Sequence, residues 1–136
     1  MTIELFAMKE TRPLSPHLTI YKPQISSVLS IMHRITGVIM FFGFLLILWI
    51  TNMYTFKSNT LEDFGGILTY VMRNKFFLSI VILFSYCIFY HMCTGIRYLF
   101  WDAGKLMEIK TVNLTGWLAI IISAALTVFF WYTIIL

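Results

Sequence analysis

The sequence has few charged residues: Asp, Glu, Lys and Arg make up 12% of its 136 residues, whereas 60% are hydrophobic. Soluble domains of this size carry about 25% charged residues and are nearer half apolar. The apolar excess falls in separate segments, which predicts a membrane protein, and this length favours one domain, residues 1–136. The net charge of +4 comes from basic residues that form no stripe, so nucleic-acid binding is not expected.

Cysteine is also scarce. Cys87 and Cys93 lie in one apolar run, six residues apart and on roughly opposite faces of a helix. This spacing excludes a disulfide within the helix and matches no metal or redox motif, so both are interpreted as small hydrophobic residues. The N-terminus lacks the apolar core of a signal peptide and contains Glu4 and Glu10, so we expect it to face the compartment where the chain is made.

Catalytic patterns are missing as well. The sequence shows no nucleophile–base pair, no carboxylate pair and no phosphate-binding loop. No catalytic residue is therefore assigned, and we do not expect the chain to be an enzyme on its own.

Three long apolar runs are present, at about residues 30–54, 75–101 and 114–136. Each reaches the roughly 20 residues that a helix needs to cross the hydrocarbon core. Backbone groups in lipid must bond within their own segment, so an all-α protein with three transmembrane helices is expected. No Asp or Glu lies inside a run, which disfavours a small transporter subunit. A short interfacial helix is predicted after Gly65 and Gly66 in the first loop.

Lys and Arg predict the orientation. The segment 1–29, the second loop and the span ends beside them hold seven of these residues, and the first loop and its flanks hold three. The excess predicts the N-terminus inside and the C-terminus outside. His33, about one turn into the first helix, and His91, about 16 Å deep in the second at 1.5 Å per residue, then belong to the inner half and can share a site. The seven are Lys9, Arg12, Lys22, Arg34, Arg97, Lys105 and Lys110, and the three are Lys57, Arg73 and Lys75.

His91 is the deepest ionisable residue, and such residues in spans indicate function. Gly95, four residues on, lies on the same helix face and is expected to leave a flat space beside the imidazole. A haem with His91 as axial ligand suits that space; the alternative is a histidine bonded to a neighbouring helix. Tyr98 faces the same side, and Arg97 is interpreted as a charged anchor at the span end.

Ser30, His33, Arg34 and Gly37 form one stripe on the first helix. The arginine offers several donors and stays charged, so the stripe suits a carboxylate, a haem propionate or a quinone carbonyl. The alternative is an arginine that reaches out to lipid phosphate.

Three motifs, RPLSPHLTIYKPQ, SIMHRITG and H-x-x-x-GIRYLFWD, resemble the cytochrome b membrane-anchor subunits of succinate dehydrogenase (Complex II), in the alphaproteobacterial and mitochondrial branch. The resemblance covers the N-terminal segment and parts of the first two helices. It implies a haem b shared with a second, small anchor subunit, which supplies the other axial ligand. It also implies that the two anchors hold a flavoprotein subunit and an iron–sulfur subunit to the membrane. In this family, electrons from succinate pass through these subunits to ubiquinone.

The resemblance also implies residue roles. His91 is the axial ligand to the haem iron, and Ser30 and Arg34 line the quinone site. His33 lies beside the haem propionates, and Arg97 is a further propionate candidate. Many members have histidine after GIR, whereas this chain has Tyr98, which donates a hydrogen bond but carries no positive charge at neutral pH.

Two alternatives remain open from the sequence. One is an anchor of a quinol–fumarate reductase, and the other is a structural or assembly subunit without haem. The expected location is a bacterial inner membrane, or the mitochondrial inner membrane if the chain is encoded in the organelle.

Overall fold

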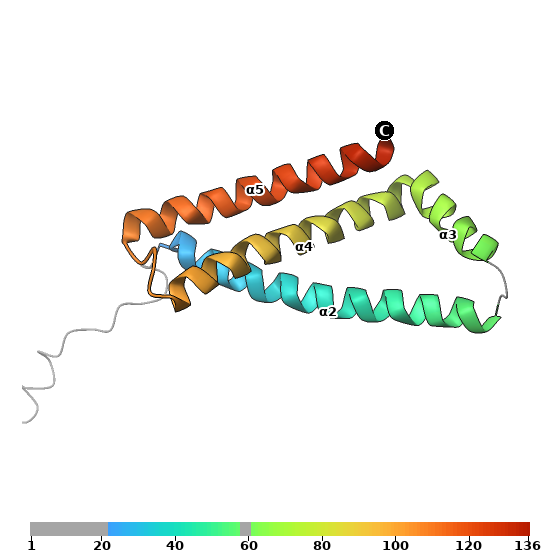
Figure 1. Ribbon diagram of the computed structural model, residues 1–136, viewed down its shortest axis with the longest axis horizontal. Helices are drawn as coiled ribbons and strands as arrows, with labels where there is room; N and C mark the ends of the chain where they lie inside the picture. The colour runs from blue at the N-terminus through green and yellow to red at the C-terminus, as the bar shows by residue number, and fades with distance from the viewer. Residues whose placement is uncertain (1–21, 58–60) are drawn as a thin grey trace, which may run out of the picture.

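The computed structural model describes residues 22–57 and 61–136, apart from the side chains of residues 54, 55, 57 and 61–64. The segment 1–29 was expected at the inner face, and its residues 1–21 lie outside the described part of the chain. The elements are α2 (Ile25–Lys57), α3 (Leu61–Arg73), α4 (Lys75–Asp102) and α5 (Ile109–Ile135) (Figure 1). Of these, α2, α4 and α5 are long and apolar enough to cross a membrane. This confirms the prediction of an all-α chain with three candidate spans.

The helices start earlier than the apolar runs do. Helix α2 begins at Ile25 and α5 at Ile109, each five residues before its predicted start. An apolar run marks the part of a helix that lies in hydrocarbon, whereas the helix itself continues through polar residues such as Lys110. The loop between α4 and α5 is correspondingly short, and it turns with positive φ at Gly104 (70°) and Leu106 (61°).

The first loop contains the short helix that the sequence predicted, but α3 includes Gly65 and Gly66 instead of following them. A sharp turn separates α3 from α4. The side chain of Asn74 caps α4 there, because its Oδ1 accepts a hydrogen bond from the backbone N–H of Phe76 at 3.0 Å.

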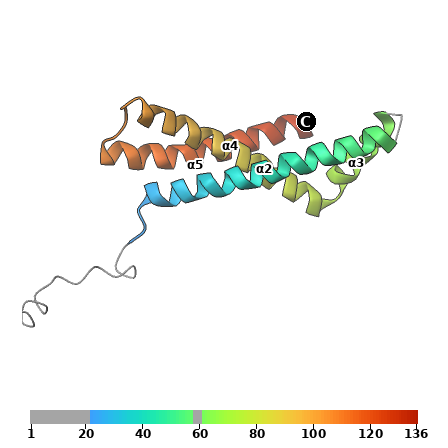
Figure 2. The ribbon, with the colours of Figure 1, turned by 90° about the horizontal axis from the view of Figure 1, so that it is seen from below.

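Helix α4 lies between α2 and α5 (Figure 1). The turned view shows that α2 and α4 cross instead of running parallel (Figure 2). They lie close together where they cross, at His33 and His91, and they separate towards α3. The start of α2, the end of α4 and the start of α5 therefore share one end of the molecule, which we call the histidine end because His33 and His91 meet near it. The C-terminus lies at the opposite end.

Small and polar side chains fill most of the interior, and most large apolar side chains are exposed. Small residues let membrane helices approach closely, and exposed apolar surface suits lipid or other membrane subunits. In the half away from the histidines, Trp131 of α5 donates from Nε1 to Ser85 Oγ of α4 at 2.8 Å. The buried polar residues are Thr36, Ser85, Thr94, Arg97, Ser123 and Thr127.

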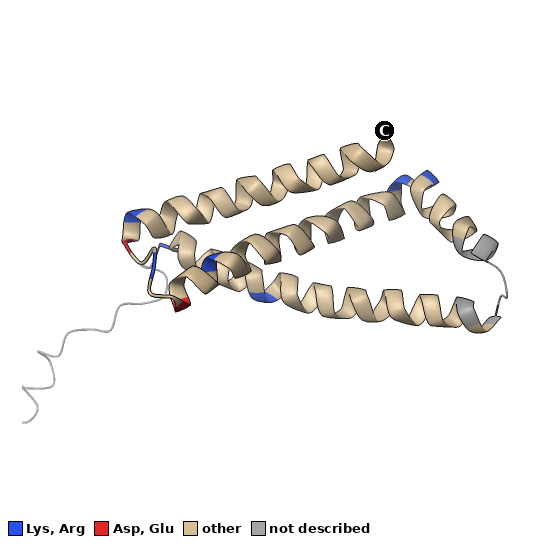
Figure 3. Ribbon diagram, viewed as in Figure 1, with Lys and Arg blue, Asp and Glu red and all other residues tan. Residues whose placement is uncertain are grey.

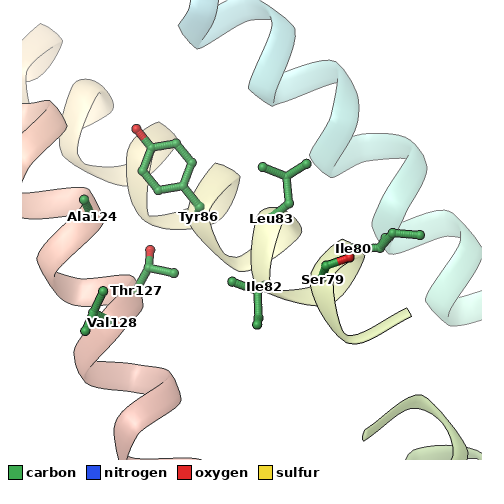
Figure 4. A pocket seen from close by; sticks show the side chains of 8 residues that line it. All are labelled: Ser79, Ile80, Ile82, Leu83, Tyr86, Ala124, Thr127 and Val128. Carbon is green, nitrogen blue, oxygen red and sulfur yellow. The ribbon is translucent and has the colours of Figure 1, made fainter. Parts of the chain in front are cut away.

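A groove of about 570 Å³ lies between α4 and α5 in that same half. Figure 4 shows its lining side chains, among which Ser79, Tyr86 and Thr127 contribute hydroxyl groups and the others are apolar. This lining contains no charged side chain and no histidine. The ionisable residues of the candidate site lie at the histidine end instead.

Candidate functional site

Two histidines from different helices meet where α2 and α4 cross. The rings of His33 and His91 stack with their centroids 3.8 Å apart and an interplanar angle of 13°. Both side chains are half-buried. The crossing of the helices thus brings together the two residues that were expected to share a site.

The surroundings of His91 determine which of its nitrogens carries the proton. Nδ1 lies 3.1 Å from the backbone carbonyl oxygen of His33 and 3.2 Å from Oγ1 of Thr36. A carbonyl oxygen can only accept a hydrogen bond, so Nδ1 must carry the proton. Nε2 then keeps its lone pair, as an imidazole that binds a metal requires. His91 therefore bonds to the neighbouring helix through Nδ1, and its Nε2 makes no hydrogen bond to another residue that the structure describes.

His33 has a matching arrangement. Its Nδ1 lies 2.7 Å from Oγ1 of Thr94. The single hydroxyl proton of Thr94 is donated to the backbone carbonyl of Tyr90 at 2.7 Å, so the threonine oxygen accepts from Nδ1–H of His33. The ring of Tyr98 meets the ring of His33 edge-on at 5.0 Å. Tyr98 therefore faces the site, as its position on the helix predicted.

The glycine that lies beside His91 is not the one that we expected. The sequence suggested that Gly95 leaves space beside His91. Instead, a Cβ on Gly37 of α2 would lie 3.0 Å from Cε1 of His91, whereas a Cβ on Gly95 would lie 3.9 Å from Cε1 of His33. The expectation was wrong because spacing along α4 shows which residues share a face, while the crossing with α2 decides which residue lies opposite each ring.

Arg97 does not behave as the interfacial anchor that we expected. Only 4% of the residue is exposed, and its guanidinium group donates from Nε to Thr115 Oγ1 at 3.1 Å and from Nη2 to the carbonyl of Val112 at 2.8 Å. Its Cζ also lies 4.1 Å from the ring centroid of Trp101. The arginine thus joins α4 to α5 inside the bundle. A groove of about 250 Å³, otherwise lined mostly by apolar residues, lies beside it.

Three buried polar atoms at the histidine end have no hydrogen-bond partner within the described part of the chain. They are Nη1 of Arg97, the hydroxyl oxygen of Tyr98 and Nε1 of Trp101. The side chains that carry these atoms are neighbours, because the Tyr98 and Trp101 rings lie 5.3 Å apart and Cζ of Arg97 lies 4.1 Å from the Trp101 ring centroid. A buried donor without an acceptor costs about 1–3 kcal/mol. An acceptor-rich ligand, such as a carboxylate, would satisfy these donors.

The stripe predicted on the first helix divides into two parts. His33 and Gly37 face α4, as described above. Ser30 is half-buried and Arg34 is exposed, and neither side chain makes a hydrogen bond to another residue that the structure describes. A guanidinium group placed in this way can bind a ligand, a partner subunit or a lipid phosphate, so both interpretations of Arg34 remain.

A free metal ion has no ready site in residues 22–57 and 61–136. No group of three or more His, Cys, Asp or Glu side chains is positioned there to hold one. A metal carried by a macrocycle is different, because it needs only axial ligands from protein. One correctly oriented histidine per subunit is enough for such a group.

Thr36, Thr94 and Trp101 contact the candidate site residues, and the sequence did not lead us to expect this. A signal for the two threonines was nonetheless present, because residues 33–37 read HRITG and residues 91–95 read HMCTG, both of the form H-x-x-T-G. The repetition identifies equivalent positions on two helices. No comparable pattern marked Trp101, whose importance comes from its contact with Arg97.

Comparison with known proteins adds an independent result. Residues 8–130 match the model of the family described as succinate dehydrogenase/fumarate reductase transmembrane subunit. The succinate dehydrogenase cytochrome b556 subunit of Rickettsia bellii is 48% identical over 121 residues, which cover 88% of this chain and 90% of that protein. The cytochrome b560 subunit of Reclinomonas americana is 41% identical over 133 residues, covering 91% and 87%.

Proposed function

The chain belongs to the family of succinate dehydrogenase/fumarate reductase transmembrane subunits, as the cytochrome b membrane subunit of a succinate dehydrogenase, and on this premise we propose how its residues serve haem and quinone. His91 binds the iron of a haem b, and Ser30 with Arg34 forms part of a site that reduces ubiquinone. The chain is a multi-pass membrane subunit, and succinate itself is oxidised in another subunit.

The observation that supports the haem proposal most directly is the hydrogen bonding of His91. Its Nδ1–H donates to the carbonyl of His33 at 3.1 Å, which leaves Nε2 as the ligand atom. The residues present therefore fit an axial ligand. When bound, haem b supplies reversible one-electron transfer, and the protein controls its potential through the axial ligand and the groups bonded to it.

The cluster of unpartnered donors fits the propionates of the same haem. Arg97 was predicted as a propionate partner, and its Nη1 is buried without an acceptor among the described residues. The Tyr98 hydroxyl and Trp101 Nε1 are two further atoms of this kind. A propionate carboxylate would accept hydrogen bonds from such a cluster, and the guanidinium would offset its charge. We propose that His33, which lies between Tyr98 and His91, borders the same group.

The stacked rings support a second haem ligand from outside this chain. The His33 and His91 rings lie face to face at 3.8 Å, so the two imidazoles could not both bind one haem iron in this arrangement. His91 would hold the haem from this chain, and His33 would not be its second ligand. We infer that the ligand comes from a second, small membrane-anchor subunit.

The quinone site is proposed on the outward side of α2. Arg34 is exposed and has no partner among the described residues, and Ser30 lies one turn before it. Their donors can hydrogen-bond a quinone oxygen and stabilise the negative charge that develops on it during reduction. The flavoprotein and iron–sulfur subunits would deliver the electrons from the same side. The named relatives favour succinate oxidation over the reverse reaction.

We propose that the histidine end faces the inside of the membrane. Figure 3 shows Lys and Arg at both ends of the described chain, with more of them at the histidine end. Of the basic residues whose side chains the structure describes, five belong to that end and two to the other, an excess typical of the inner side. The five are Lys22, Arg34, Arg97, Lys105 and Lys110, and the two are Arg73 and Lys75.

The haem assignment is tested with the complex purified from its native membrane. We expect His91→Leu to remove or strongly reduce the reduced-minus-oxidised haem b spectrum. Met92→Leu is the matched control, because Met92 is the next residue on α4 and is 45% exposed. Full haem content with an unchanged potential in His91→Leu would overturn the assignment. Co-purification of a flavoprotein and an iron–sulfur protein in equal amounts is expected for wild type.

A further inference from the structure

We propose that Thr36 is a positioning residue for the haem ligand, and that it acts through its hydroxyl group on Nδ1 of His91. The inference rests on the proposed role of His91 as axial ligand. It concerns a residue on the other helix, and it assigns to a threonine of α2 the control of an imidazole on α4.

The two H-x-x-T-G segments pack against each other as a reciprocal pair. In each segment the threonine lies one turn after its own histidine, and it contacts the histidine of the opposite helix. Thr36 reaches His91 at 3.2 Å, and Thr94 reaches His33 at 2.7 Å. Because α2 and α4 run in opposite directions, one crossing produces both contacts.

The hydrogen bonds of Thr36 show what its hydroxyl does. Its proton is donated to the backbone carbonyl of His33 at 2.9 Å, so the oxygen lone pairs are free to accept. Nδ1–H of His91 points at both this oxygen and the same carbonyl, at 3.2 Å and 3.1 Å. The threonine therefore provides a second acceptor for one proton. It also ties that acceptor to the carbonyl, so both move with α2.

Burial makes this arrangement matter. Thr36 is 3% exposed, so water does not compete for the proton of His91. Two acceptors on one N–H hold the ring in a single tautomer and restrict its rotation. They also make Nε2 more basic, which favours the oxidised iron. Loss of such a partner typically lowers metal affinity roughly 10–100-fold.

Thr127 provides the matched control. It is also buried, at 6% exposure, and its hydroxyl donates to the backbone carbonyl of Ser123 at 2.8 Å, in the half of the bundle away from the histidines. Thr94 does not serve as a control, because it contacts His33 and also donates to the backbone carbonyl of His91 at 3.2 Å. Removing the hydroxyl of Thr127 thus costs a buried hydrogen bond but leaves His33, His91 and both acceptors of Nδ1 in place.

The test uses the purified complex with Thr36→Val, Thr36→Ser, Thr36→Ala and Thr127→Val. Haem affinity is measured by the rate of haem transfer to an excess of apoglobin, and the haem midpoint potential by redox titration. We expect Thr36→Val and Thr36→Ala to release haem roughly 10–100-fold faster and to have a higher potential. Thr36→Ser, which keeps the hydroxyl, and Thr127→Val should stay close to wild type in both measurements.

The comparison of serine with alanine decides the outcome, since both lack the buried methyl group and differ only in the hydroxyl. If the valine variant does not assemble, this pair still gives the answer. Equal haem release and equal potential in Thr36→Ser and Thr36→Ala would overturn the proposal, as would an equal effect of Thr127→Val. Failure of the haem assignment is distinguishable, because His91→Leu would then keep its haem.

Discussion

Gly37→Ala should disturb His91, the proposed haem ligand, through a contact that only the crossing of α2 and α4 creates. The new Cβ would lie 3.0 Å from Cε1 of His91. Two carbon atoms prefer about 3.5–4.0 Å, so the ring or the helix has to move by about 0.5 Å. The bond from His91 Nδ1 to the carbonyl of His33 is already 3.1 Å long. Lengthened to about 3.6 Å, it would no longer be a hydrogen bond.

The expected effect is a loss of haem affinity of roughly 10–100-fold, the usual consequence of losing a partner of a metal ligand. The assay is haem transfer from the purified complex to apoglobin, together with haem content per complex. Gly66→Ala is the control, because a Cβ at Gly66 in α3 meets nothing within 4 Å. That change adds only the ordinary helix preference for alanine, about 0.5–1 kcal/mol.

Wild-type haem release in Gly37→Ala would refute this reasoning. It would mean that the two helices separate without cost to His91, so that the tight contact at Gly37 has no part in holding the ring. A loss of haem in Gly66→Ala as large as that in Gly37→Ala would also refute it, because the effect would then not depend on the contact.

Three further predictions follow from contacts of other residues. Arg34→Leu should slow quinone reduction at least about tenfold, since a charge-assisted hydrogen bond contributes roughly 1.5–3 kcal/mol, while succinate oxidation with a soluble acceptor stays normal; unchanged quinone kinetics would contradict the assignment. Arg97→Lys cannot reproduce both hydrogen bonds to α5, so the complex should lose about 1–3 kcal/mol of stability, measured as haem release at a lower temperature. An unchanged release temperature would contradict a stabilising role for these two hydrogen bonds. Gly43→Ala should be destabilising by about 1–3 kcal/mol, because its Cβ would collide with the ring of Phe84, and Phe84→Leu in the same chain should partly restore the thermal stability; no recovery in the double variant would argue against this contact.

Much of the fold could be predicted from the sequence. Apolar runs long enough to cross a bilayer, with almost no internal charge, leave helix as the only suitable backbone. Helix ends were predicted less well: Ile25 and Ile109 precede their apolar runs, because a helix does not stop where hydrocarbon does. The pairing of His33 with His91 was predictable too, since alternating spans place the start of one helix beside the end of the next.

The details of the site were harder to predict, and Arg97 illustrates why. Its position near the end of a span is that of an interfacial anchor, and nothing in α4 itself suggests otherwise. Its partners, Thr115 and the carbonyl of Val112, belong to α5 and follow a short loop. A hydrogen bond between helices depends on how far each helix is rotated about its axis, and rotation depends on packing across the whole interface.

The sequence by itself determined three membrane helices, the family, and the presence of two H-x-x-T-G segments. The tertiary structure alone decided that these segments pair reciprocally, that Gly37 and not Gly95 lies against His91, and that Arg97 points inward. The physical reason is that the pattern within one helix does not determine how two helices pack against each other. Helical periodicity assigns residues to a face, whereas the partner of each face is selected by close packing of small side chains and by the hydrogen bonds that this packing permits.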